Sequence, residues 1–323
     1  MKGNKSENKS HPLEPLVDLY IQYIDVTEKS KKRYNKILTH FIKYIKAHKI
    51  KSPDRKHIIK YREYMFDLGY TANSVHTFMS VLKGFYSFLQ QNQRRYNLDS
   101  IYIYDITKGI KTAKINNKFR KLPLTLKQAQ NVLENAQRKC LDINGYRNYA
   151  VILLMITTGL RGIEIIRARK CDLAKLNDHS ILYVHGKNRD EADEFVKVPK
   201  EVTKALNNYL MRRSDNGRYL FVSHSNGSSS QQLSTAYLNS VFKDLLRECG
   251  IVDPRITLHS LRHTAATFNL LRGGTLESTQ QLLRHASIQT TMIYLHHINR
   301  VKDNSEFEIE NYIFKNGKEV EDQ

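Results

Sequence analysis

The sequence predicts a mainly α-helical protein with a small β-sheet, divided into an all-α N-terminal domain and a mixed α/β second domain. Three observations support this fold class. The chain has 323 residues, which is more than one average domain needs. Apolar residues recur with helical spacing from Leu13 to Gln90. Two short runs rich in β-branched and aromatic residues, 181–184 and 195–198, flank a polar segment, a pattern typical of a β-hairpin with a long loop.

The first domain is expected at residues 11–110, after a polar tail at residues 1–10. Four apolar stripes predict four helices in this region, and their limits are 16–24, 34–45, 58–65 and 75–89. The third helix should end near Gly69, and the fourth should begin within residues 71–74. Because the joints between the stripes are short, we expect a compact helical unit.

Residues 111–121 carry basic and no acidic side chains, and we interpret them as a linker that either follows phosphates or is simply solvated. The second domain is expected at 122–300, with its first helix starting at Thr125. After the hairpin, residues 221–223 suggest a further strand. The later helices are expected at 234–249, 260–271, 276–283 and 288–294. Residues 301–323 form an acidic tail.

The charge of the chain favours a polyanionic partner. The formal net charge is +20, and residues 1–120 carry 24 basic against 10 acidic side chains. Neutralising phosphates with such charge releases counterions, so nucleic acid is the favoured partner. A membrane surface is the alternative, but the charge is spread along the chain and not concentrated in one amphipathic helix.

Other features bound the function further. The longest apolar run, 149–156, is too short to span a membrane, and the polar first ten residues lack a signal-peptide core. We therefore expect a cytoplasmic protein. Its three cysteines, Cys140, Cys171 and Cys249, are far apart and predict neither a disulfide framework nor a zinc site. They are expected to be buried free thiols.

Two arginine motifs are candidates for chemistry. In TTGLRGIEIIRAR, residues 157–169, an apolar helix should end at Gly159, with Arg161 just beyond it. An arginine that closes a helix end by ion pairing is the alternative interpretation. In HSLRH, His259 and Arg262 share one face at a helix start. A bound anion would relieve the conflict of these residues with the helix dipole. The adjacent His263 is expected to point elsewhere.

Two further patterns follow the same logic. In LLRHASIQTTMIYLH, residues 282–296, a short helix should present Tyr294 nine residues after His285. Core packing is the ordinary role of such a tyrosine, and the chain contains 19 tyrosines. Lys187 lies in the expected hairpin loop, where a lysine is ordinarily only solvated.

Taken together and in this order, the motifs resemble the catalytic box of the tyrosine recombinases, the group that contains the Xer proteins, Cre and phage lambda integrase. The similar segment runs from Leu122 to His296. The helical unit before it is similar to the family's core-binding domain, most clearly at NSVHTFMSVLKGFYSFL, residues 73–89. The resemblance implies seven site residues, namely Arg161, Glu164, Lys187, His259, Arg262, His285 and Tyr294.

The resemblance also implies a role for each of them. Arg161 and Arg262 would grip the scissile phosphate, with His285 hydrogen-bonded to it. Tyr294 would attack the phosphorus, leaving a 3′-phosphotyrosyl bond and a free 5′-hydroxyl.

His259 would act as the general base for the tyrosine, and Lys187 as the general acid for the leaving oxygen. Glu164 would orient the site without touching DNA. Outside the catalytic set, Lys83 and Arg189 are the residues that we expect to contact DNA.

The family's reaction uses neither a cofactor nor a metal. It implies double-stranded DNA with paired inverted half-sites as substrate and a tetramer on DNA as the active assembly. The apolar residues of the tail are expected either to dock on a neighbouring protomer or to pack on their own domain, and they are Phe307, Ile309, Tyr312 and Ile313. Because about a dozen residues precede the first helix, no separate accessory-site domain is expected.

Two alternatives compete with site-specific recombination. One is DNA relaxation of the type IB topoisomerase kind, which uses similar chemistry without exchanging strands between partners. The other is a non-catalytic, sequence-specific DNA-binding regulator. Integration, excision and resolution are all compatible with the motifs, and accessory proteins are not indicated by the sequence.

Overall fold

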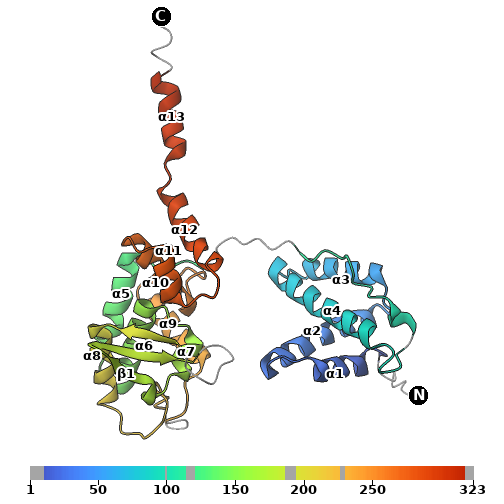
Figure 1. Cartoon of the computed structure of the whole chain (residues 1–323), viewed down its shortest axis with the longest axis horizontal. Coiled ribbons are helices and arrows are strands. Elements are labelled where there is room, and N and C mark those ends of the chain that lie inside the picture. Colours follow the sequence, from blue (N-terminus) through green and yellow to red (C-terminus); the bar gives the residue numbers. More distant parts are fainter. Residues whose placement is uncertain (1–10, 99, 114–120, 186–193, 226–229, 317–323) are drawn as a thin grey trace, which may run out of the picture. The chain divides into compact units, whose positions relative to one another are not determined.

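The computed structural model describes residues 11–98, 100–113, 121–185, 194–225 and 230–316. It separates into two compact units, residues 1–118 and 119–323 (Figure 1). Each unit has its own apolar core. The fold class predicted from the sequence, mainly helical with a small sheet in the second unit, is confirmed.

The described part of the N-terminal unit has four α-helices and one short 3₁₀ helix, which are α1 (Glu14–Tyr23), α2 (Glu28–Ala47), α3 (Arg55–Asp67), α4 (Ala72–Asn92) and η1 (Ser100–Ile103). Polar side chains set the helix starts: Thr27, Asp54 and Thr71 each accept a hydrogen bond from a backbone N–H in the first turn. Apolar faces of α2 and α4, including Phe41 and Phe85, form the centre of the core. The four helices lie where the apolar spacing predicts them.

The second unit contains the remaining elements. Its helices are α5 (Leu126–Arg138), α6 (Ile143–Thr158), α7 (Gly162–Arg167), η2 (Lys170–Asp172), α8 (Lys200–Leu210), α9 (Thr235–Glu248), α10 (Leu258–Leu271), α11 (Leu276–Leu283), α12 (Gln289–Lys302) and α13 (Ser305–Asn316). Its strands are β1 (Leu173–Leu176), β2 (His179–Val184) and β3 (Glu194–Val198).

Helix α6 is the centre of this unit. Its residues from Ala150 to Ile156 are all buried, and the helix packs against α5, α8 and α10. A helix buried on all sides can be apolar all round, which explains the unbroken apolar run in the sequence. The carboxyl end of α6 lies beside α10, since Gly159 accepts a hydrogen bond from Arg262, so the two arginine motifs of the sequence meet here.

The sheet is antiparallel in the order β1-β2-β3, with Leu182 opposite both Leu173 and Val196. Strands β2 and β3 confirm the predicted hairpin, whereas β1 was not predicted. The prediction of a strand at residues 221–223 is wrong. Within the described residues, this segment forms only an isolated bridge between Val222 and Gln232. Phe221 and Val222 are fully buried, so core packing without strand pairing explains their apolar character.

Two other expectations can be compared with the described residues. The three cysteines are free, but they are not buried as expected: Cys171 is exposed, and Cys140 and Cys249 are partly exposed. None of the helices in the described part of the chain combines the length and the apolar character that crossing a membrane requires.

Candidate active site

The site begins where α6 ends. Gly159 adopts a left-handed conformation with φ of 66°, and its carbonyl oxygen accepts a hydrogen bond from Nη1 of Arg262 at 2.6 Å. A Cβ added at Gly159 would lie 2.7 Å from Cδ2 of Leu283. Glycine is therefore needed here both for the turn and for the close approach of α10 and α11.

Arg161 lies two residues further on, at the start of α7, and Glu164 holds it in place through hydrogen bonds. The backbone N–H of Arg161 donates to Oε2 of Glu164 at 2.8 Å, and its Nη1 donates to Oε1 at 2.7 Å. Glu164 is 4% exposed, whereas the Arg161 side chain is 36% exposed. The carboxylate thus anchors one edge of a guanidinium whose side chain stays partly exposed.

A second, buried arginine lies beside this pair. Arg262 is 1% exposed, and besides Gly159 its guanidinium donates to the carbonyl oxygen of Leu283. Burial and the nearby charge of Arg161 lower the pKa of Arg262 to about 9, so the side chain still carries its charge at neutral pH. Burial is the main cause of this lowered pKa and the charge of Arg161 adds to it, and a bound anion would offset both effects.

Three histidines border these arginines. The rings of His259 and His263, one turn apart on α10, are 4.8 Å apart, and the ring of His263 is 5.3 Å from that of Tyr294. On the other side, Nδ1 of His285 and the hydroxyl of the buried Thr291 are hydrogen-bonded at 2.9 Å. That bond fixes the orientation of the His285 ring and leaves Nε2 for another partner.

The same histidines are kept neutral. Burial, followed by the charges of Arg262 and Arg161, lowers the pKa of His259 below its usual value and that of His285 to about 4. Burial and the adjacent His259 lower the pKa of His263 to about 3. At neutral pH each ring therefore has one nitrogen that accepts a proton or a hydrogen bond.

Tyr294 lies on α12 and is 5% exposed, in contact with an apolar cluster that includes Ala266 and Leu283. Burial raises the pKa of its hydroxyl to about 12, although the positive charges of Arg262 and Arg161 act to lower it. The hydroxyl is therefore protonated at neutral pH, and a nucleophilic role requires a base.

Six of the seven predicted site residues meet in this region, and they are Arg161, Glu164, His259, Arg262, His285 and Tyr294. The seventh, Lys187, and the expected DNA contact Arg189 lie outside the described residues. Lys83 lies on α4 of the N-terminal unit and is half-buried. Among the described residues, no three or more His, Cys, Asp or Glu side chains are grouped as metal ligands.

Sequence reasoning missed three residues of the site. The expectation that His263 points elsewhere is wrong, because a residue four positions after His259 lies on the same helix face. Arg284, whose Nη2 donates to Glu164 at 2.8 Å, gave no signal beyond its place beside His285. Lys121, assigned to the linker, lies near enough to lower the pKa of both His259 and His263.

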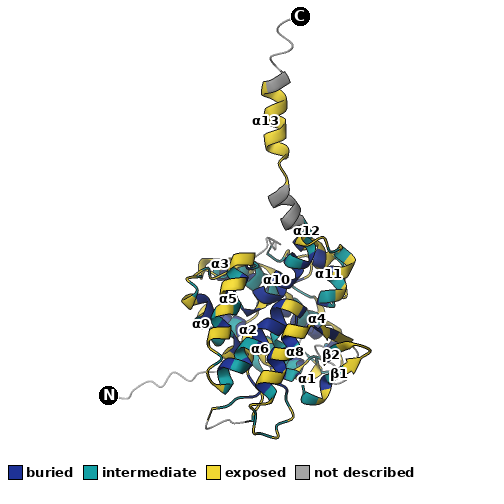
Figure 2. Cartoon of the chain, turned by 90° about the vertical axis from the view of Figure 1, so that its left-hand side faces the viewer, coloured by how far each residue is buried: buried dark blue, intermediate teal, exposed yellow. Residues whose placement is uncertain are grey.

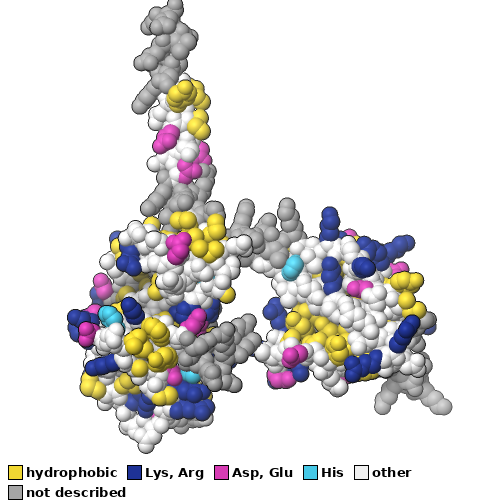
Figure 3. Space-filling model, in the orientation of Figure 1, with side chains coloured by type: hydrophobic (Ala, Val, Ile, Leu, Met, Phe, Trp, Pro, Cys, Tyr) yellow, Lys and Arg dark blue, Asp and Glu magenta, His cyan; other side chains and the backbone are white. Residues whose placement is uncertain are grey.

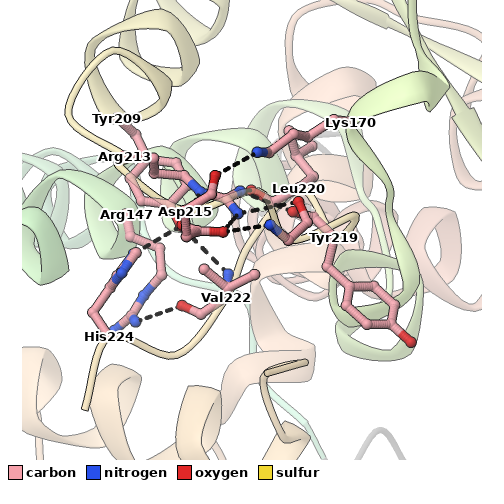
Figure 4. Close-up of polar contacts among 10 residues, drawn as sticks. Arg147, Lys170, Tyr209, Arg213, Asp215, Tyr219, Leu220, Val222 and His224 are labelled. Atoms are coloured by element: carbon pink, nitrogen blue, oxygen red, sulfur yellow. Dashed lines mark hydrogen bonds and ion pairs between the residues drawn. The ribbon is translucent and has the colours of Figure 1, made fainter. Parts of the chain in front are cut away.

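Another arginine cluster, at the amino end of α6, differs from this site (Figure 4). Arg147 donates to the carbonyl oxygen of Val222 at 2.8 Å. Arg213 donates through Nε to Asp215 at 2.8 Å and through Nη1 to Tyr219 and Leu220. These guanidinium groups bind the chain itself, so the cluster stabilises the loop after α8 and does not form an anion site.

Comparison with known proteins agrees with this geometry. The model of the phage integrase family matches residues 123–300, and that of the phage integrase N-terminal SAM-like domain matches residues 17–93. The chain belongs to the phage integrase family. The prediction of a tyrosine recombinase, made from the motifs alone, is thereby confirmed.

Relatives of this family member include tyrosine recombinase XerA of Pyrococcus furiosus, which is 26% identical over 86% of this chain and 88% of the relative. Tyrosine recombinase XerD of Listeria innocua is 26% identical over 87% and 93%. Site-specific recombination is the activity that the names of these relatives indicate, whereas neither a type IB topoisomerase nor a non-catalytic regulator gains support from them.

The solved structures that share the fold include two recombinase–DNA complexes. One is XerH recombinase in a post-cleavage complex with a palindromic difH substrate, with a TM-score of 0.67 and 20% identity over 88% of this chain and 80% of that chain. The other is a lambda integrase (75–356) dimer bound to a COC′ core site, with a TM-score of 0.65 and 17% identity over 86% and 96%.

Proposed function

We propose that this phage integrase family member is a site-specific recombinase that cuts and rejoins double-stranded DNA through a covalent bond between Tyr294 and a 3′-phosphate. The observation that carries the proposal is the meeting of Arg161, Arg262 and His285 with the buried hydroxyl of Tyr294. An excess of positive charge beside a protonated nucleophile suits a phosphodiester and its more negatively charged transition state.

The two arginines are the proposed phosphate ligands. Arg262 is fixed by two backbone carbonyl oxygens, and Arg161 is fixed along one edge by Glu164. Rigid guanidinium groups bind phosphate oxygens without losing much side-chain entropy. His285, oriented by Thr291, adds a neutral hydrogen-bonding group to the same pocket.

The proton transfers follow from the neutral histidines. His259 accepts the proton of Tyr294 as the tyrosine oxygen bonds to phosphorus, and the bond from phosphorus to the 5′-oxygen breaks. By resemblance, Lys187 donates a proton to that 5′-oxygen. The phosphotyrosyl ester keeps the energy of the broken bond, so a 5′-hydroxyl from another strand reverses the step without a cofactor or a metal.

Assembly is the second part of the proposal. Exchange between two duplexes requires four cut strands, which a tetramer on paired inverted half-sites provides. The tail supports such assembly, because residues 305–314 of helix α13 are all exposed (Figure 2). Its apolar side chains are 57–70% exposed, and they are Phe307, Ile309, Tyr312, Ile313 and Phe314. We propose that they dock on a neighbouring protomer.

DNA as the partner is supported by charge as well as by the site. Basic side chains stand out on the visible surface of the N-terminal unit (Figure 3), and α2 alone carries Lys32, Lys36 and Lys43 on exposed positions. Contacts of this type supply affinity that does not depend on sequence, while base contacts select the site.

A covalent-trapping experiment tests the proposal. The full-length protein is incubated with nicked duplexes that carry randomised inverted half-sites around a short spacer, so that a cut strand diffuses away and cannot be rejoined. We expect a protein–DNA adduct that survives denaturation and EDTA and is lost in Tyr294→Phe. Stable binding of the same duplexes without any adduct would contradict the proposal and favour a DNA-binding regulator.

A further inference from the structure

One charged residue of the site has no role in the reaction described above. Arg284 ends helix α11 in a left-handed conformation, with φ of 53° and ψ of 51°. This conformation is disfavoured for any residue with a Cβ, and such strain persists where the surroundings hold the residue in place. The side chain is only 6% exposed, so a buried cation occupies a position where glycine would be less strained.

The contacts of Arg284 lead directly to the proposed phosphate ligand. Its Nη2 donates to Oε2 of Glu164 at 2.8 Å, the same oxygen that accepts the backbone N–H of Arg161 at 2.8 Å. The other oxygen of Glu164 accepts Nη1 of Arg161 at 2.7 Å. Arg284 also lies 3.7 Å through Nε from Oε2 of Glu194, where β3 begins. One buried carboxylate is thus shared by two arginines.

We propose that Arg284 is a positioning residue for the cleavage reaction, which holds Glu164 ionised and in place so that Glu164 in turn aims the Arg161 guanidinium at the phosphate. This inference rests on the proposed function. The guanidinium of Arg284 donates to Glu164 and to the carbonyl oxygen of Leu282, so its effect on the phosphate ligand Arg161 passes through Glu164. Arg284 directly precedes His285 in the chain, so the left-handed turn at Arg284 also affects where the His285 ring lies.

The electrostatics of Glu164 agree with this arrangement. Burial acts to raise the pKa of the carboxyl, but the charge of Arg284, then the hydrogen bonds and charge of Arg161, hold it below 4.5. From α10, Arg262 and His259 also interact with Glu164. The charge of Arg284 is the first of the causes that lower this pKa, and Arg161 adds two hydrogen bonds and its own charge. Without it, the buried carboxylate would be a poorer anchor, because its ionised form would be less favoured.

Three variants separate charge from backbone strain. Arg284→Gly removes the guanidinium and relieves the left-handed strain, so a residue that served only the turn would be replaced without loss. Arg284→Lys keeps a charge for Glu164. Lys49→Gly is the matched control, because Lys49 also has a positive φ, of 55°, but is exposed and lies in the N-terminal unit.

The first measurement uses the duplex recovered by covalent trapping. We expect Arg284→Gly to cut saturating DNA about 100-fold more slowly, the scale that a misplaced catalytic group produces, while its DNA affinity stays at the wild-type level. Arg284→Lys should recover much of the lost rate, and Lys49→Gly should cut as the wild type does. Wild-type cleavage by Arg284→Gly, or equal losses in the Gly and Lys variants, would overturn the proposal.

The second measurement needs no DNA, so its outcome does not depend on the proposed function. A depressed carboxyl pKa adds stability at neutral pH that is lost as pH falls through the folded-state pKa. The Tm difference between wild type and Arg284→Gly should therefore narrow as pH drops from 7 to below 4.5, the ordinary glutamate value. A difference that stays constant over this range would show that Arg284 does not hold Glu164 ionised.

Discussion

At the scale of single residues, the site is organised by a charge imbalance. Arg161, Arg262 and Arg284 surround one buried carboxylate, that of Glu164. Isolated buried charges are costly, and proteins keep them where they are paired or where a ligand completes the pairing. The imbalance therefore marks a place prepared for an anion, and the buried Tyr294 lies beside it.

Replacement of Arg262 by lysine tests how far the site's function depends on the planar shape of the guanidinium. A lysine ammonium cannot donate to Gly159 and Leu283 in the fixed fork that the guanidinium uses. We expect Arg262→Lys to cut DNA about 100- to 1000-fold more slowly, as loss of a transition-state donor does. Single-turnover cleavage measures the rate. Arg247→Lys, on the exposed side of α9, is the control and should cut normally.

The pH dependence of cleavage tests the proposed base. A general base works in its deprotonated form, and the pKa of His259 is lowered by burial and by the charges of Arg262 and Arg161. The cleavage rate should therefore hold as pH falls through 6.5 and decline only below that value. Rates measured between pH 5 and pH 8 test this. A decline that begins above 6.5 and persists in His259→Gln would contradict the assignment.

The sequence motifs predicted the members of the site better than the assignment of residues to helix faces did. The order of TGLR, HSLRH and the H-to-Y spacing was enough to find six residues that meet in space. The error at His263 was one of helix face, because positions four apart lie on the same side of a helix, and the sequence of α10 also does not show what packs against that face. Helix α12 covers that face with Tyr294, which no local pattern in α10 reveals.

At the scale of elements, the helices with clear apolar stripes and polar caps were the most predictable. Residues 276–283 were expected as a helix and form α11 with those bounds. Helix α12, expected at 288–294, begins at Gln289 and runs on to Lys302, so its end was predicted too early. Strand β1 was missed, since LAKL is short and half-exposed, and its pairing with β2 is a tertiary effect.

The turn between α6 and α7 gives a test at this scale. Gly159→Ala forces a Cβ into a left-handed turn and against Leu283, whereas Gly250→Ala, with φ of 68°, meets nothing within 4 Å. Both should lose about 1–2 kcal/mol for the conformation, and Gly159→Ala should lose more because the buried Leu283 side chain must shift. Urea unfolding measures the two free energies. Equal losses would mean that the contact between α6 and α11 is not tight.

At the scale of the whole molecule, the exposed apolar side chains of α13 are the feature that a single protomer leaves unexplained. An exposed apolar stripe on a helix is typical of a surface that is covered in an assembly. The sequence predicted four of these side chains and missed Phe314, and their partner depends on a second chain that no local pattern specifies.

Substitution of the α13 stripe tests assembly separately from cleavage. A variant with Phe307, Ile309, Tyr312 and Ile313 replaced by serine should keep the wild-type Tm, because these side chains are exposed. It should bind single half-sites normally but form fewer higher complexes on paired sites, as measured by sedimentation. Val252→Ser, which alters another exposed apolar residue, should assemble as the wild type does. Undiminished tetramers in the α13 variant would rule out docking by this helix.

The most direct test of the account is to identify the amino acid that becomes joined to DNA. The trapped adduct is digested with nuclease and protease, and mass spectrometry locates the residue that carries the nucleotide. We predict that a nucleotide is attached, through its 3′-phosphate, to the peptide that contains Tyr294. No nucleotide should be attached to the other 18 of the 19 tyrosines. A nucleotide on any other residue, or a 5′-linkage, would contradict the central claim.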